Sequence, residues 1–186
     1  MNRLFSLLLA VFSLLILLLP IILISIMVYF SSHGSILYWS KRIGKNSLIF
    51  YMPKFRTMYL KTPEVATHLL QNPEVFLTPI GGFLRKTSLD ELPQIWSVIK
   101  GDMNFVGPRP ALFNQEDLIL LRKENEVDSL TPGITGWAQV NGRDELSILD
   151  KVDFDIEYMR RRSFLFDIKI LWMTFSKIME RDGVSH

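Results

Sequence analysis

The sequence of 186 residues predicts an α+β, mainly helical protein that begins with a membrane-embedded helix. Three observations support this fold class. Residues 4–30 contain no charged side chain. Many later segments repeat apolar residues at the three-and-four spacing of a helix face, and two short apolar segments flank a glycine-containing turn. We therefore expect one membrane helix, a small β-hairpin and several further helices, some of them amphipathic.

The composition excludes several classes of protein. The chain has no cysteine, which excludes a disulfide framework, a thiolate metal site and a cysteine nucleophile. Large apolar side chains are too frequent for a disordered chain. A net charge of +2 is weak for a protein that neutralises several phosphates of a duplex, so we expect no nucleic-acid partner. Nearly all charges follow His33, which divides the chain into a membrane segment, 1–33, and a membrane-associated domain, 34–186.

The apolar segment 4–30 is longer than the apolar region of a secretory signal. At ~1.5 Å per residue a straight helix of this length would reach roughly 40 Å, more than the ~30 Å hydrocarbon core. Pro20 removes a backbone hydrogen bond inside it and predicts a kink. Arg3 precedes the segment and Lys41 and Arg42 follow it, so the positive-inside rule allows both ends in the cytoplasm. Two interpretations stay open: a re-entrant helix that bends at Pro20, or a tilted spanning helix that tolerates the proline.

The remaining elements follow in chain order. Two short segments with a turn between them predict a β-hairpin, and capping and stop signals predict three helices before a glycine-containing loop. The last 35 residues return to helix. The predicted strands are 35–39 and 48–52 around the turn 41–46, the helices are 64–71, about 92–100 and 113–123, and the loop is 131–143.

The final helical segment carries a broad apolar face directly after Arg160, Arg161 and Arg162. A basic cluster next to such a face suits an interfacial helix among anionic headgroups. Packing of the face into the domain core is the alternative, and the two can hold on different faces. The face consists of Phe164, Ile168, Leu171, Trp172, Phe175, Ile178 and Met179, widened by Leu165, Phe166, Ile170 and Met173.

Asp90 and Glu91 lie side by side at a predicted helix start. Ser88 and Glu91 have the spacing of a capping box, which would give Glu91 a purely structural role. Pro93 favours a helix start near Asp90, because proline is tolerated in the first turn. At the positive end of a helix one carboxylate is kept ionised, which suits a nucleophile or a magnesium ligand, and its neighbour can be raised in pKa for proton transfer.

Several donor groups predict an anion site. Arg109 is held between two prolines that restrict the backbone, so its guanidinium is presented for bidentate contact with a phosphate, unless the segment is only a rigid surface turn. The loop 131–143 supplies glycine N–H groups and the side chains of Gln139, Asn141 and Arg143. Lys54 and Arg56 add cations. Together with the acidic pair, these groups predict a phosphorylated substrate and a divalent metal, for which Mg²⁺ is the choice.

Three blocks of residues resemble the signature blocks of the bacterial sugar transferases, the monotopic phosphoglycosyl transferases. The resemblance covers nearly the whole chain, with the blocks in the same order and at similar spacing. Residues 183–185 resemble more weakly the subgroup that starts glycan assembly for protein glycosylation. The three blocks are Lys54-Phe55-Arg56-Thr57-Met58, the run 85–110, and the run 132–143.

The resemblance implies a fold and a reaction. The fold would contain a re-entrant membrane helix broken at Pro20, and the domain 34–186 would be catalytic and lie on the cytoplasmic face of the bacterial inner membrane. The reaction would move a phosphosugar from a UDP-sugar to undecaprenyl phosphate and release UMP. Asp90 would form a covalent phosphosugar ester, and Glu91 would assist Mg²⁺ binding or proton transfer. The implied phosphate or nucleotide contacts are Arg85, Arg109 and Arg143, with Arg56 as a cation facing the site.

The chain departs from the family pattern at three places. Leu19 replaces the serine that often precedes the membrane proline, Ser40-Lys41-Arg42 replaces a common glutamine and arginine pair, and Tyr59-Leu60-Lys61 replaces acidic residues. Two other functions stay open: a lipid-linked nucleotidyl transferase or phosphatase with the same donors, and a membrane-anchored nucleotide-binding or scaffold module without turnover. The sequence names neither the sugar nor the oligomeric state.

Overall fold

The computed structural model describes residues 3–32, 34–63, 72–142 and 145–180. These residues confirm the α+β, mainly helical fold class and the small hairpin. The predicted helix 64–71 lies outside the described residues, as do Arg143 and the run 183–185. The elements are α1 (Arg3–Ser32), β1 (Leu37–Ile43), β2 (Ile49–Phe55), α2 (Gly81–Lys86), α3 (Ile95–Lys100), β3 (Asn104–Val106), α4 (Glu116–Glu124), β4 (Gly133–Thr135), α5 (Trp137–Val140), α6 (Ile148–Arg161) and α7 (Phe164–Glu180), with 3₁₀ helices at Lys45–Ser47, Pro73–Phe76, Leu89–Gln94 and Val127–Ser129.

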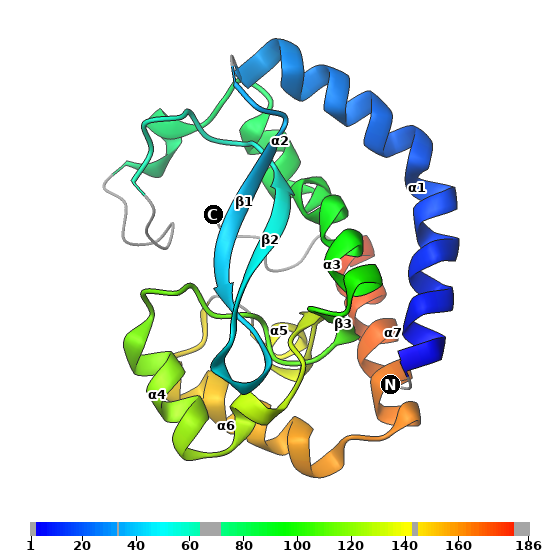
Figure 1. Ribbon diagram of the computed structural model, residues 1–186, viewed down its shortest axis with the longest axis vertical. Coiled ribbons are helices and arrows are strands. Elements are labelled where there is room, and N and C mark those ends of the chain that lie inside the picture. Colours follow the sequence, from blue (N-terminus) through cyan, green and yellow to red (C-terminus); the bar gives the residue numbers. More distant parts are fainter. Residues whose placement is uncertain (1–2, 33, 64–71, 143–144, 181–186) are drawn as a thin grey trace.

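Helix α1 contains Pro20 in its interior and is, among the described residues, the one helix long and apolar enough to cross a membrane. Figure 1 shows α1 following one edge of the domain and changing direction about half-way along. Only 11% of its most apolar stretch is buried, so most of the helix presents apolar side chains outward. Its inner face packs on the domain through Ala10 near one end and through Ile24 and Val28 near the other.

Both ends of α1 are attached to the same domain. At the start, the Arg3 guanidinium donates hydrogen bonds to the carbonyls of Val98 (2.6 Å) and Ile99 (2.7 Å) in the last turn of α3. At the other end, α1 runs into β1 after a short connection. A helix that crossed a bilayer would place its two ends on opposite sides, so this attachment favours the re-entrant interpretation.

The hairpin is longer than the sequence indicated. Strands β1 and β2 pair antiparallel from Leu37 opposite Phe55 to Ile43 opposite Ile49. The predicted turn 41–46 was wrong at its start, because Lys41, Arg42 and Ile43 continue the strand. Arg42 is held there by hydrogen bonds from its guanidinium to Ser40 Oγ (2.9 Å) and the Pro110 carbonyl (3.1 Å). The chain reverses over Gly44 to Leu48, where the Gly44 N–H donates to the Leu48 carbonyl.

The prediction of an irregular loop at 131–143 was wrong in part. Strand β4 pairs in parallel with β3, and α5 follows it directly. The pair is very close at Gly133, where an added Cβ would lie 2.1 Å from the Gly107 nitrogen. Three-residue strands are too short to show a period of two, and this contact joins segments far apart in the chain, so no local pattern reveals it.

The C-terminal helical segment is two helices, α6 and α7, separated by Arg162 and Ser163. One face of α7 is buried: Phe166 and Ile170 pack with Trp137 and Tyr158 in the core. The opposite face is exposed, so packing into the core is confirmed for one face, and the interfacial interpretation stays a prediction for the other. Of the three arginines, Arg161 stacks on Phe166 at 4.4 Å from the ring centre. The exposed face consists of Phe164, Leu165, Ile168, Trp172, Phe175 and Ile178.

Candidate active site around Asp90 and Glu91

Asp90 and Glu91 lie in the 3₁₀ helix Leu89–Gln94, which continues directly into α3. Pro93 is accommodated within this short helix. Ser88 begins it in the left-handed region, at φ 55°, and its side chain makes no capping hydrogen bond. The predicted capping box is therefore wrong, because the hydroxyl of its first residue is not used as a cap. The Glu91 carboxylate is available for other partners.

Glu91 is the anion at the centre of two ion pairs. Lys54 Nζ and Arg109 Nη2 each lie 2.7 Å from the same oxygen, Oε1. Lys54 comes from β2, and Arg109 from the proline-flanked segment after β3. Burial alone would raise the pKa of Glu91, but Arg109 and Lys54 outweigh it and hold the pKa well below its usual range. Glu91 is thus ionised throughout the physiological pH range.

Asp90 is buried, and its surroundings act in the opposite direction. Among the described residues it forms an ion pair with Lys54 Nζ, 3.9 Å from Oδ2. Burial raises the pKa of Asp90, and the neighbouring negative charge of Glu91 adds to the rise, while Lys54, Arg85 and Arg109 only partly offset it. Glu91 is therefore the permanently charged member of the pair, and Asp90 is the member with the raised pKa. This is the reverse of the expectation that joined the ionised carboxylate to the nucleophile and the raised pKa to proton transfer. A desolvated, more basic carboxylate is the better nucleophile.

Lys54 forms ion pairs with both carboxylates, and burial lowers the pKa of its ammonium group, opposed by Glu91 and Asp90. Lys54 belongs to the first of the three sequence blocks, but the family resemblance implied Arg56 as the cation facing the site. Alternate residues of a strand share a face, so the sequence could place Lys54 and Arg56 on the same side. It could not show which of the two cations contacts Asp90 and Glu91, because that depends on how β2 packs against the 3₁₀ helix.

Arg85 lies at the end of α2, where its guanidinium donates to Thr57 Oγ1 (3.1 Å) and contacts Met58 Sδ (3.4 Å). Burial lowers the pKa of Arg85, and the charge of Asp90 opposes this. The structure therefore brings four of the predicted residues together in one electrostatic group, Asp90, Glu91, Arg85 and Arg109, and adds Lys54 to them.

The other predicted binding residues lie differently. The Arg56 guanidinium donates to the Ser35 carbonyl (2.9 Å) and hydroxyl (2.7 Å). Among the described residues, the cations that shift the pKa values of Asp90 and Glu91 do not include Arg56. Asn141 donates to the Trp137 carbonyl (2.7 Å) within the α5 turn. Both polar atoms of the Gln139 amide are buried with no hydrogen-bond partner among the described residues. Buried amides normally form hydrogen bonds, so this side chain could bind a polar group of a ligand. Arg143 lies outside the described residues.

The carboxylate pair fits a magnesium ion that also binds substrate. No group of three or more His, Cys, Asp or Glu side chains within the described part of the chain could hold a metal. Mg²⁺ commonly uses one or two carboxylates and completes its shell with substrate phosphates and water. Glu91 Oε1 accepts hydrogen bonds from Lys54 Nζ and Arg109 Nη2, each at 2.7 Å. The carboxylates of Asp90 and Glu91 would hold the ion, and the ion would supply positive charge to a substrate phosphate.

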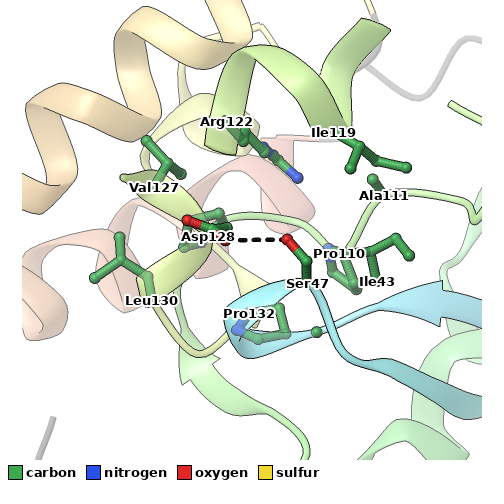
Figure 2. Close-up of a pocket in the computed structure, with 12 residues that line it drawn as sticks. Ile43, Ser47, Pro110, Ala111, Ile119, Arg122, Val127, Asp128, Leu130 and Pro132 are labelled. Carbon is green, nitrogen blue, oxygen red and sulfur yellow. Dashed lines mark hydrogen bonds between the residues drawn. The ribbon is translucent and has the colours of Figure 1, made fainter. Parts of the chain in front are cut away.

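A pocket borders the segment that presents Arg109 (Figure 2). Ser47 Oγ donates to Asp128 Oδ2 across it at 3.0 Å. Figure 2 shows Arg122 reaching over the pocket from α4, near Ile119. The pocket is lined by Ile43, Gly44, Ser47, Pro108, Pro110, Ala111, Ile119, Arg122, Val127, Asp128, Leu130 and Pro132.

Comparison with known proteins bears on this site. A family model described as "Bacterial sugar transferase" matches residues 1–181. The chain is 40% identical over 185 residues to "Uncharacterized sugar transferase EpsL" of Bacillus subtilis (strain 168), covering 99% of this chain and 90% of that protein. It is 41% identical over 162 residues to "UDP-glucose:undecaprenyl-phosphate glucose-1-phosphate transferase" of Escherichia coli (strain K12), covering 83% of this chain and 35% of that protein. It is 36% identical over 189 residues to "UDP-galactose-lipid carrier transferase" of Erwinia amylovora, covering 92% and 39%, respectively. The chain thus spans little more than a third of the last two relatives.

Proposed function

The chain belongs to the bacterial sugar transferase family, and on this premise we propose that it transfers a phosphosugar from a UDP-sugar to undecaprenyl phosphate. The names of two relatives give the substrate classes: a UDP-sugar donor and an undecaprenyl phosphate or lipid carrier acceptor. The single observation that carries the proposal is the pair Asp90 and Glu91, in which a buried carboxylate of raised pKa adjoins one held ionised by two cations.

In the first step, an Asp90 carboxylate oxygen attacks the sugar-proximal phosphorus of the donor. The new bond joins that oxygen to phosphorus, and the bond between this phosphorus and the bridging oxygen of the diphosphate breaks. UMP leaves with the electron pair. Burial favours the attack because the Asp90 carboxylate loses less hydration as it reacts.

In the second step, an oxygen of undecaprenyl phosphate attacks the same phosphorus and displaces Asp90. The product is a polyprenyl diphosphosugar, and the free carboxylate is restored. Glu91 holds Lys54 and Arg109 next to the reacting phosphate, where their positive charges offset the charge of the phosphoryl oxygens. Arg85 adds a third cation near Asp90. A magnesium ion on Asp90 and Glu91 would neutralise charge on the diphosphate.

The proposed substrates set the place of the reaction. One is water-soluble and the other is a lipid, so the site has to lie at a membrane surface. Helix α1 as a re-entrant anchor, with its bend at Pro20, and the exposed apolar face of α7 would hold the domain 34–186 there in contact with membrane lipids. We assign the site to the cytoplasmic face of the bacterial inner membrane, where UDP-sugars are available.

Replacement of Asp90 by asparagine tests the function. We expect Asp90→Asn to lower the rate of UMP release by at least about 1,000-fold, because a nucleophile is lost. Mass spectrometry of wild-type protein incubated with donor alone should find a phosphosugar adduct on Asp90. The matched control is Asp153→Asn, an exposed carboxylate on α6, which should keep full activity.

The outcomes separate the proposal from the two other functions. Full activity of Asp90→Asn, or no adduct on Asp90, would contradict the covalent mechanism. Release of inorganic phosphate in place of UMP would indicate a phosphatase. Nucleotide binding without any magnesium-dependent consumption of the donor would indicate a binding module. A panel of UDP-sugars in the same assay identifies the sugar.

A further inference from the structure

We propose that Arg122, braced by Asp155, is a positioning residue that sets the orientation of Arg109 in the active site. The inference rests on the proposed function, in which Arg109 acts on the donor phosphates together with Glu91. Arg122 belongs to α4 and Asp155 to α6, so two helices outside the reacting group would determine how one of its cations is presented.

The Arg122 guanidinium makes two kinds of contact. Its Nε and Nη2 donate to Asp155 Oδ2 at 3.0 Å and 2.6 Å. Its Nη1 donates to the main-chain carbonyl of Arg109 at 2.7 Å. Asp155 is 1% exposed, and burial raises its pKa against the opposing charge of Arg122. A buried carboxylate fixes one edge of the guanidinium, and the remaining edge is directed at the Arg109 backbone.

The hydrogen bond from Arg122 to the Arg109 carbonyl constrains ψ of Arg109, the backbone angle that the two flanking prolines do not fix. Proline rings fix φ at positions 108 and 110, and Pro110 also disfavours helical conformations at Arg109. The direction of the Arg109 carbonyl depends on ψ of Arg109, within the range that remains. A hydrogen bond to that carbonyl selects one value and therefore aims the side chain.

The flanking carbonyls are held as well. The Pro108 carbonyl accepts from the Gly133 N–H at 2.9 Å, and the Pro110 carbonyl accepts from Arg42 Nη1 at 3.1 Å. Three consecutive carbonyls thus have donors from three different parts of the fold. Arg122 is the donor at the middle one, next to the side chain that binds Glu91 Oε1 at 2.7 Å.

Arg122→Lys separates positioning from folding. Lysine keeps a positive charge beside Asp155, so the buried carboxylate is not left unpaired. A single ammonium lacks the rigid fork that lets arginine reach Asp155 and the Arg109 carbonyl together. We expect kcat/KM for the UDP-sugar to fall roughly 10-fold, less than the ~100-fold that a full 1 Å misplacement can cost. The neighbouring exposed residue provides the matched control, Lys123→Arg, which should change nothing.

A double-mutant cycle with Arg109→Gln distinguishes this role from a general structural one. If Arg122 acts through Arg109, Arg122→Lys should cost less than about 2-fold in the Arg109→Gln background, since the side chain that it positions is gone. Equal losses in both backgrounds would overturn the inference. Absence of turnover in the wild type would instead reject the proposed function.

A second measurement does not depend on turnover. Hydrogen exchange followed by mass spectrometry should show faster exchange in Arg122→Lys for a peptide covering residues 104–113. A peptide from α3 should be unchanged, and Lys123→Arg should match the wild type in both. Unchanged exchange across 104–113 would overturn the inference even if the protein proves to have another function.

Discussion

Asp90 and Glu91 are adjacent in the chain, yet their surroundings shift their pKa values in opposite directions. The difference comes from contact geometry. Arg109 and Lys54 both reach Glu91 Oε1 at 2.7 Å, whereas Lys54 lies 3.9 Å from Asp90 Oδ2. Pairs of titratable groups separated in this way commonly divide the roles of a reaction. Glu91 holds the cations here, and in the proposed function Asp90 is the group that reacts.

In the proposed reaction, the charge of Lys54 should influence the acidic limb of the activity profile. Asp90 has to be ionised to attack, so activity falls as the pH drops through its pKa, and burial places that pKa above the usual Asp value. Lys54 is the largest influence that lowers it. Removing the charge in Lys54→Met therefore raises the pKa of Asp90 further. We expect the acidic limb of kcat/KM against pH to move to higher pH, measured by UMP release.

The control for this prediction is Lys45→Met, an exposed lysine in the hairpin turn. It removes the same charge at a position that does not act on Asp90 and should leave the limb in place. A limb that moves to lower pH in Lys54→Met, or does not move, would show that Asp90 is not the group whose ionisation limits the rate.

Elements with local signals could be predicted from the sequence, and those built on long-range contacts could not. The end of α3 follows from Gly101, which adopts φ 102°, and the hairpin follows from its apolar segments. The parallel pair β3–β4 has no such signal, because it joins residues 104–106 to residues 133–135. In the site, Arg109 was identified by its flanking prolines, while the contact of Lys54 with Glu91 joins residues 37 positions apart and depends on the finished fold.

The close approach of β3 and β4 predicts that a larger residue at Gly133 destabilises the fold. An added Cβ at Gly133 would lie 2.1 Å from the Gly107 nitrogen and 2.5 Å from the Thr135 carbonyl oxygen. Both are backbone atoms, so the strands have to separate. We expect Gly133→Ala to lower the free energy of unfolding by at least about 2 kcal/mol, which corresponds to about 4–8 °C in Tm for a chain of this size. Thermal unfolding of the detergent-solubilised protein measures this change in Tm.

Gly82→Ala is the matched control. The nearest atom to an added Cβ at Gly82 is the Leu77 Cδ1, at 3.8 Å, an ordinary contact. Gly82 lies inside α2, where alanine is favoured by up to about 1 kcal/mol over glycine. This variant should unfold at the same temperature or slightly higher. Equal unfolding temperatures of Gly133→Ala and Gly82→Ala would mean that β3 and β4 do not lie as close together as described.

At the scale of the whole molecule, the apolar surface is concentrated on two helices that meet. Phe5 at the start of α1 contacts Phe164 at the start of α7, with ring centres 5.1 Å apart. The outward side chains of α1 and the exposed face of α7 are large and apolar, an arrangement suited to lipid and costly in water. Figure 1 shows α4 on the opposite side of the domain from α1, with the hairpin between them. The molecule thus exposes large apolar side chains along α1 and α7, the surface that the proposed function places against lipid.

The attachment of Arg3 to the last turn of α3 predicts the topology of the N-terminus. Because that contact holds the start of α1 against the domain, both ends of the helix should share one side of the membrane. The chain has no cysteine, so a single introduced thiol reports one position. In spheroplasts, Asn2→Cys and the domain control Lys123→Cys should both resist a membrane-impermeant maleimide, and both should react after lysis. Reaction of Asn2→Cys before lysis, with Lys123→Cys still protected, would show that α1 spans the bilayer and that its proline does not return the chain.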